Sequence, residues 1–198
     1  RNAHDRVLGL AKDLGLTCVS YVIAAAPGQS AASSLNDLLC LAQKRTLVGL
    51  SIFYPAPGSL DYETCRTRGL LPKSFSLMRS TALPLDDTTT RLEAVTLLRL
   101  ARILNFIKSR IDSHGCLPSG ESCVSDVPGP IDRRDRISHK LVQSFLQDGI
   151  IRGADKKGNL YVHKTDADLC QKFIKEIKNL PLMGVEKSPF SFPESRIL

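Results

Sequence analysis

Two short loops, each following a run of apolar residues, carry the groups best suited to bind a ligand. The first spans residues 27–30 and contains Gly28, and the second spans residues 55–59 and contains Gly58. Glycine lacks a Cβ, so a Pro-Gly turn lets backbone amides approach a bound molecule closely. The alternative for both loops is a tight turn that only leads the chain into a helix.

The six cysteines do not follow the spacing of a metal site. No two of them are separated by only two or three residues, as structural zinc sites require. They are Cys18, Cys40, Cys65, Cys116, Cys123 and Cys170. Two alternatives stay open: a site formed by His114 and Cys116 with Cys123, and an exposed, reactive Cys65.

Other catalytic motifs are absent from the sequence. It contains no Gly-x-Gly-x-x-Gly, no phosphate-binding loop with its lysine, no His-Glu-x-x-His and no nucleophile elbow. His4, His139 and His163 are isolated in sequence, as surface or structural histidines usually are. We therefore expect no metal site, and the catalytic residues stay unknown.

The two loops are positioned by a strand, a helix and a second strand. Residues 16–24 and 46–54 are apolar and rich in β-branched side chains, which is typical of buried parallel strands. A helix is expected between them, capped by Ser33 or Ser34 and ending near Gln43. Such a βαβ unit makes a parallel sheet and brings both loops to its carboxyl end, where ligands bind.

A helix over residues 5–14 precedes this unit, and residues 61–85 show no regular pattern. The longest helix is expected to open at Asp86, Asp87 or Thr88 and to end near Ser113.

The remaining chain divides into a linker, a small module and a tail. Residues 114–131 are rich in proline and glycine, which predicts a linker after a domain of residues 1–113. Residues 132–180 are expected to form a helix, a hairpin tipped by Lys156 and Lys157, and a further helix, similar to a winged-helix unit. Residues 181–198 form the tail.

The composition is that of a globular protein. The chain has 198 residues, 42% of them hydrophobic and 24% charged, with a net charge of +7. This length allows one domain, or one domain and a small appendage. No stretch approaches the roughly 18 apolar residues of a membrane span, and free thiols are typical of the cytoplasm. The chain opens without methionine, so we expect a fragment or a processed chain.

Residues 21–30 and 48–59 resemble the fifth and sixth strands of radical S-adenosylmethionine enzymes, in particular the branch with cobalamin-binding radical proteins and oxygen-independent coproporphyrinogen oxidases. The fifth strand of these enzymes typically ends in Gly-Leu-Pro-Gly-Gln-Thr, where this chain has Ala-Ala-Pro-Gly-Gln-Ser at residues 25–30. Their sixth strand leads to a Tyr-Pro-x-Pro-Gly-Thr loop, where this chain has Tyr-Pro-Ala-Pro-Gly-Ser at residues 54–59. The resemblance covers residues 1–70, with the helix of residues 88–112 as its continuation.

The resemblance implies an α/β fold, the C-terminal portion of a partial (β/α) barrel followed by a small winged-helix-like module. In this family a Cys-x3-Cys-x2-Cys loop holds a four-iron cluster that binds S-adenosylmethionine, and its reductive cleavage yields a radical that abstracts hydrogen. This chain lacks that loop and resembles the family only after the fourth strand. The implied partner is thus the missing N-terminal half of the barrel. Both cofactors belong to the full-length parent, and neither is expected to bind tightly to this chain alone.

The resemblance also implies cofactor contacts at six positions. They are Ile23, Ala25, Gly28, Ser51, Tyr54 and Gly58. The first strand end, with Ile23 and an alanine in place of the usual glycine at position 25, matches the adenine side. Ser51, Tyr54 and the turn at Gly58 match the end that borders adenine and substrate.

Two other functions stay open. The net charge of +7 and the winged-helix-like segment of residues 132–165 suggest a module that binds nucleic acid or a partner, with Lys156 and Lys157 on phosphates. This alternative is not favoured, because aromatic stacking residues are scarce. A stand-alone scaffold that completes a barrel in trans is the third possibility. The substrate, the reaction and any role of cobalamin are not defined by the sequence.

Overall fold

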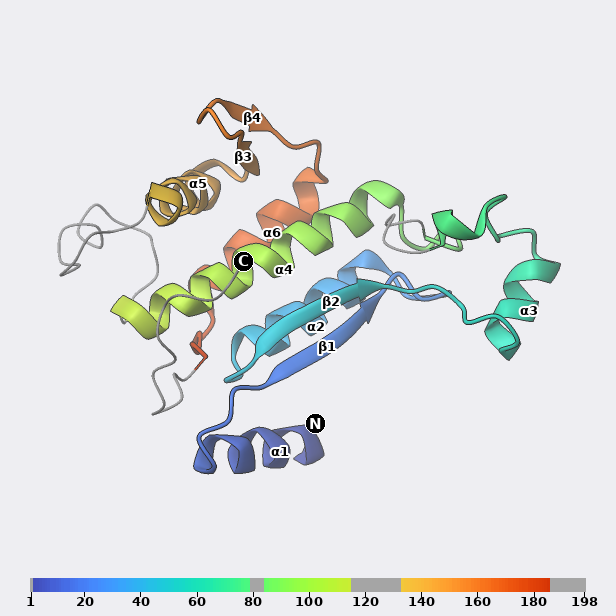
Figure 1. The fold of residues 1–198 in the computed structure, drawn as a ribbon, viewed down its shortest axis with the longest axis horizontal. Coiled ribbons are helices and arrows are strands. Elements are labelled where there is room, and N and C mark those ends of the chain that lie inside the picture. The colour runs from blue at the N-terminus through green and yellow to red at the C-terminus, as the bar shows by residue number, and fades with distance from the viewer. Residues whose placement is uncertain (1, 79–83, 115–132, 186–198) are drawn as a thin grey trace.

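Two parallel strands joined by a helix form the centre of the fold (Figure 1). Strand β1 (Val19–Ala24) pairs in register with strand β2 (Leu47–Ile52), and helix α2 (Ala31–Ala42) connects them. The predicted βαβ unit and the mixed α/β class are therefore confirmed. The chain is seen in a computed structural model that describes residues 2–78, 84–114 and 133–185.

Helices α2 and α4 (Arg91–His114) pack on the β1–β2 sheet, and further helices pack on them. Helix α4 packs against β2 and α2, and helix α6 (Ala167–Asn179) packs against α2 and α4. Helix α5 (Arg133–Asp148) extends the same hydrophobic core. Its most deeply buried members include Leu35, Leu38, Leu97, Leu100, Leu104, Phe145, Phe173 and Ile177. The core is thus continuous between α4 and the C-terminal segment.

The C-terminal segment contains the predicted sequence of helix, hairpin and helix. Strands β3 (Arg152–Ala154) and β4 (Leu160–Val162) form an antiparallel pair between α5 and α6. The predicted linker, apart from His114, lies outside the described residues. In the part of the chain that the structure describes, none of the helices combines the length and apolar character of a membrane span.

Two helices lie at opposite ends of the β1–β2 unit. Helix α1 (Asn2–Asp13) lies on the β1 side, and helix α3 (Leu60–Thr67) follows β2 (Figure 1). Helix α3 and a short 3-10 turn at Phe75–Leu77 fall in the stretch that we expected to be irregular. Helix α3 was missed because its apolar pattern is weak and only Cys65 within it is buried.

The start of α2 differs from the prediction. The hydroxyl of Ser30 accepts a hydrogen bond from the amide of Ser33 at 3.2 Å, so Ser30 is the N-cap and the helix begins at Ala31. Ser34 instead is buried inside the helix. A cap at Ser30 leaves no gap between the Pro-Gly turn and the helix.

The start of α4 also differs. The amide of Thr90 donates to the Glu93 carboxylate at 2.6 Å, and the amide of Glu93 donates to the Thr90 hydroxyl at 3.2 Å. This reciprocal pair is a capping box, which starts the helix at Arg91. Asp86 therefore does not cap α4 and binds elsewhere, as described below.

The two edges of the β1–β2 sheet differ. On β2, the side-chain amide of Asn105 both donates to the carbonyl of Val48 and accepts from its amide, each at 2.8 Å. On β1, the carbonyls of Cys18 and Ala24 accept hydrogen bonds from the β2 side. Because alternate residues of a parallel strand face opposite neighbours, the backbone groups of residues 19, 21 and 23 point away from β2. No described strand pairs with that edge.

A buried ammonium group joins three segments at the other end of α2. Lys108 has no exposed surface, and its Nζ donates to the carbonyls of Ala42, Lys44 and Met183 at 3.3, 2.5 and 2.8 Å. The amide of Met183 in turn donates to the carbonyl of Ala42 at 3.0 Å. Residues 181–185, the start of the predicted tail, are thereby held against α2 and α4.

Burial has an electrostatic consequence for Lys108. Desolvation lowers the pKa of Lys108 from 10.5 to about 8, with Arg45 adding to the effect and the carboxylate of Asp112 opposing it. The amide of Val185 donates to the same carboxylate at 2.5 Å. The ammonium is thus stabilised mainly by carbonyl dipoles, including those at the negative end of α2.

We predict that Asn105→Leu destabilises the fold by about 2–4 kcal/mol, because it leaves the amide and the carbonyl of Val48 without partners in a buried place. The free energy of unfolding in urea measures the effect. The matched control is Asn36→Leu, an exposed position on α2, which should change stability by no more than about 0.5 kcal/mol. Equal losses in the two variants would contradict the role given to Asn105.

We predict that stability increases with pH as Lys108 titrates. The pKa of Lys108 is about 8 in the folded chain and takes its ordinary value of 10.5 in the unfolded chain. Between pH 8 and pH 10.5 the unfolded chain therefore binds more protons than the folded chain. Stability gained through this group between about pH 7 and pH 10 is then about 2–3 kcal/mol. Urea unfolding should show the gain in the native chain and not in Lys108→Met, whereas the control Lys175→Met should keep it. Parallel pH profiles of the native chain and Lys108→Met would refute the prediction.

Candidate functional site at the carboxyl ends of the strands

Each strand of the parallel sheet ends in a turn of the same kind. The amide of Gln29 donates to the carbonyl of Ala26 at 2.8 Å, and the amide of Ser59 donates to the carbonyl of Ala56 at 3.0 Å. The third residue of each turn is a glycine in the left-handed region, with φ of +80° in the first turn and +84° in the second. Proline before such a glycine is typical of a type II turn.

Each turn leads directly into a helix. The Ser30 hydroxyl caps α2, and the Ser59 hydroxyl caps α3 by accepting from the amide of Tyr62 at 3.1 Å. The positive end of α2 therefore lies next to the carboxyl end of β1, whereas α3 begins at Leu60 and lies away from the strands (Figure 1). This arrangement suits both the ligand-binding interpretation and the simpler one, a turn into a helix.

Residues 86–89 hold the first turn through hydrogen bonds, a contact that the sequence did not predict. The amide of Gly28 donates to the Asp86 carboxylate at 2.6 Å, and Asp86 also accepts from the hydroxyl of Thr88 at 2.6 Å. The hydroxyl of Thr89 donates to the carbonyl of Gln29 at 2.8 Å. Partial burial tends to raise the pKa of Asp86, but the hydrogen bonds from Thr88 and Gly28 outweigh it and lower that pKa. The Gly28 amide is thus already occupied by a side chain of this protein.

Five of the six predicted positions are exposed to solvent. Ile23 and Ser51 are register partners on the face that the helices do not cover, and both are exposed. Tyr54 follows two residues after β2 and is 45% exposed, and Gly58 is exposed in the second turn. Gly28 is exposed as well, but its amide faces Asp86.

Ala25, the sixth position, is buried and conformationally unusual. It is 1% exposed, so its side chain does not face a ligand. Its φ of +58° makes it the one described residue other than glycine in the left-handed region. For an L-residue this conformation costs about 1–2 kcal/mol. The strand end therefore keeps a backbone shape that favours glycine although the residue is alanine.

The uncovered face of the sheet offers an apolar surface with hydroxyl groups. Tyr21 is 79% exposed, and a Cβ at Gly49 would lie 2.7 Å from a carbon of its ring, so the ring lies over that glycine. Ile23 and Ser51 come next along the strands. Such a surface fits a flat ring that stacks on apolar atoms and forms hydrogen bonds at its edge.

The structure bears on one of the two cysteine alternatives, the reactive Cys65, and not on the metal site at His114, Cys116 and Cys123. Cys65 is 1% exposed, and burial raises the pKa of its thiol, which removes the reactive-thiol alternative. Among residues 2–78, 84–114 and 133–185, no three His, Cys, Asp or Glu side chains form a group able to hold a metal ion. The alternative site at His114, Cys116 and Cys123 lies outside the described side chains.

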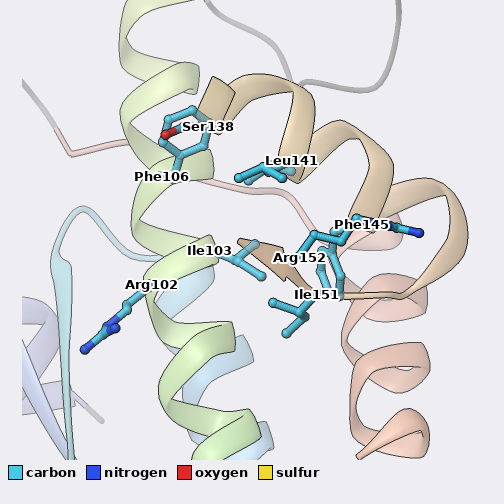
Figure 2. A pocket seen from close by; sticks show the side chains of 9 residues that line it. Arg102, Ile103, Phe106, Ser138, Leu141, Phe145, Ile151 and Arg152 are labelled. Carbon is cyan, nitrogen blue, oxygen red and sulfur yellow. The ribbon is translucent and has the colours of Figure 1, made fainter. Parts of the chain in front are cut away.

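A cavity of about 190 Å³ lies between α4, α5 and β3. Figure 2 shows Ile103 and Phe106 of α4 on one side of it, Leu141 and Phe145 of α5 on another, and Ile151 between them. The guanidinium of Arg102 points away from these side chains (Figure 2). The cavity is lined mainly by apolar groups, so it joins the C-terminal segment to α4 and offers little for catalysis.

No protein-family model, curated protein or solved structure matches the chain. Its candidate site is therefore defined by its own residues: two Pro-Gly turns, an uncovered apolar strand face, and the hydroxyls of Ser51 and Tyr54.

We predict that glycine is tolerated at position 25 and not at position 24. Ala25→Gly loses a buried methyl group but also removes the left-handed strain, whereas Ala24→Gly loses a buried methyl group from β1 with no strain to relieve. Ala25→Gly should therefore be more stable than Ala24→Gly by about 1 kcal/mol or more, as measured by urea unfolding. The reverse order would show that Ala25 is not strained.

Proposed function

We propose that this chain is the C-terminal part of a radical S-adenosylmethionine, iron–sulfur-dependent enzyme, with β1 and β2 as the fifth and sixth strands of a partial (β/α) barrel. The observation that carries the proposal is the difference between the two edges of the sheet. The Asn105 side chain forms hydrogen bonds with the backbone of Val48 at the outer edge of β2. No further strand is expected at this edge if β2 is the last strand of the sheet. None of the described strands pairs with the β1 edge, on the side where a fourth strand would pair.

Exposed apolar side chains gather on the open side. Seven large apolar residues of α1, of the segment after it and of β1 are each at least 47% exposed. They are Val7, Leu10, Leu14, Leu16, Val19, Tyr21 and Ile23. An open strand edge next to so much apolar surface is normally covered by another part of a protein. The preceding half of the barrel, as the missing partner, would cover both.

The candidate site suits one of the two cofactors. Ile23, Ser51 and Tyr54 would lie against the adenine ring of S-adenosylmethionine, with apolar contact from Ile23 and hydrogen bonds from the two hydroxyls. The iron–sulfur cluster has no place in this chain, because none of its 198 residues forms a Cys-x3-Cys-x2-Cys motif. When bound in the full-length enzyme, the cluster supplies the electron that cleaves S-adenosylmethionine. This chain alone supplies one wall of the site and no radical chemistry.

Two further observations support the proposal. Ala25 stands where the family motif has glycine, and its backbone has the conformation that glycine favours. The helix, hairpin and helix of the C-terminal segment would be the winged-helix-like accessory module that some of these enzymes carry after the barrel. The free thiols of Cys18, Cys40, Cys65 and Cys170 suit a cytoplasmic enzyme.

The proposal predicts a longer protein with a cluster-binding loop. The DNA upstream of the codon for Arg1 should continue the reading frame for about 150 codons or more and encode Cys-x3-Cys-x2-Cys. The longer protein, reconstituted anaerobically with iron and sulfide and then reduced, should convert S-adenosylmethionine to 5′-deoxyadenosine. A stop codon directly upstream, or a frame without the cysteine loop, would refute the assignment.

Hydrogen exchange compares the two edges directly. In the chain alone, the amide of Tyr21 should exchange rapidly, whereas the amide of Val48 should be protected by Asn105. In the longer protein Tyr21 should become protected, because a fourth strand then pairs with β1. Val48 serves as the internal control, since its protection should be present in both proteins. Rapid exchange at Tyr21 in the longer protein would contradict the proposed strand order.

A further inference from the structure

A basic groove lies between α5 and the turn that joins β3 to β4. It is open to solvent, has a volume of about 520 Å³ and is lined by Arg136, Ile137, Lys140, Lys157 and Gly158. A second hollow of about 240 Å³ shares Ile137, Lys140 and Gly158 with it and extends along α5 to Ser144. The two hollows thus form one groove that follows the helix for about two turns.

The positive charges of the groove come from two elements. Arg136 and Lys140 are four residues apart on α5 and therefore lie one above the other on the same side of the helix. Lys157 faces them from the turn between β3 and β4. Cations on both walls favour a ligand with negative charge along its length.

The turn that carries Lys157 is tied down by one carboxylate. Asp155 accepts hydrogen bonds from the amides of Lys157 and Asn159, both at 2.8 Å, and from the side-chain amide of Asn159 at 2.9 Å. These hydrogen bonds lower the pKa of Asp155, and the bond from the Asn159 side chain has the largest effect. Gly158 completes the turn with φ of +92°. Lys157 is therefore presented from a defined backbone.

The lysine charges of the groove are not neutralised within the described ranges. Lys140 and Lys157 form no ion pair there. Asp155 is engaged by its own turn, and Asp148 pairs with Arg152 at 2.7 Å. Asp135 on α5 is exposed and lines neither hollow.

We propose that this groove binds the sugar–phosphate backbone of duplex DNA without reading its sequence. Lysine and arginine on two walls suit consecutive phosphates, and these contacts position a protein on a duplex without specifying bases. Neither hollow is lined by an aromatic side chain, whereas sites for single strands stack bases on aromatic rings. The net charge of +7 favours the encounter. The proposal does not depend on the radical-enzyme assignment.

The test measures binding of the full chain to a fluorescein-labelled DNA duplex of about two helical turns. Fluorescence anisotropy gives the affinity at each of several salt concentrations. Affinity should fall as salt increases. In the double variant Lys140→Gln/Lys157→Gln, the slope of log K against log salt should decrease in magnitude by about 2, because two phosphate contacts are lost. The matched control is Lys172→Gln/Lys175→Gln, which removes the same charge from exposed positions of α6 outside the groove and should keep the slope.

Four results would overturn the proposal. They are no binding to the duplex at low salt, an equal loss of slope in the control variant, competition by inorganic phosphate at millimolar concentration, and equally tight binding to vesicles of anionic lipid. The third would indicate a site for free phosphate, and the fourth a membrane surface. Both double variants should unfold at the same temperature as the native chain, because the substituted lysines are exposed. Equal unfolding temperatures would show that a loss of DNA binding does not arise from misfolding.

Discussion

The fold depends on the pair of hydrogen bonds between the Asn105 side chain and the backbone of Val48. Two parallel strands have too few partners to be stable by themselves. Asn105 supplies β2 with the donor and acceptor that a third strand would offer, and it does so from the middle of α4. Because α4 also packs against α2 and α6, this contact joins the strands to the helical core. An apolar residue at 105 would pack against β2 but would leave its backbone unpaired.

Lys108, one turn further along α4, solves a different problem. The last carbonyls of a helix need donors, and at the end of α2 those carbonyls are buried. An ammonium group has three hydrogens, and here each has an acceptor on a different residue. The cost of burying the charge appears in the lowered pKa of Lys108. Burial of a cation is tolerated because it satisfies carbonyls that would otherwise be unpaired.

Local patterns predicted most of the elements but few of the contacts between them. The strands, the crossover helix and the C-terminal hairpin followed from periodicity and from turn residues, which act over short stretches. The roles of Asp86, Asn105 and Lys108 depend on partners more than 50 residues away in sequence, and nothing local marks them. The starts of α2 and α4 were misplaced because several serines, threonines and aspartates compete as caps, and tertiary contacts decide among them. The cofactor contacts expected at Ile23, Ser51 and Tyr54 stay predictions, and nothing in the sequence indicated that the Gly28 amide is occupied by Asp86.

The contacts of residues 181–185 bear on where this folding unit ends. Helix α6 finishes at Asn179, which by secondary structure alone is the natural boundary. Yet the carbonyl of Met183 is an acceptor for Lys108, and Gly184 lies so close to Asp112 that a methyl group at position 184 would displace the Asp112 carboxylate. A shortened chain that stops after α6 would leave the buried lysine with one acceptor fewer and expose the end of α2. A shortened version of this protein that keeps these contacts must therefore extend at least to Val185, six residues beyond the end of α6.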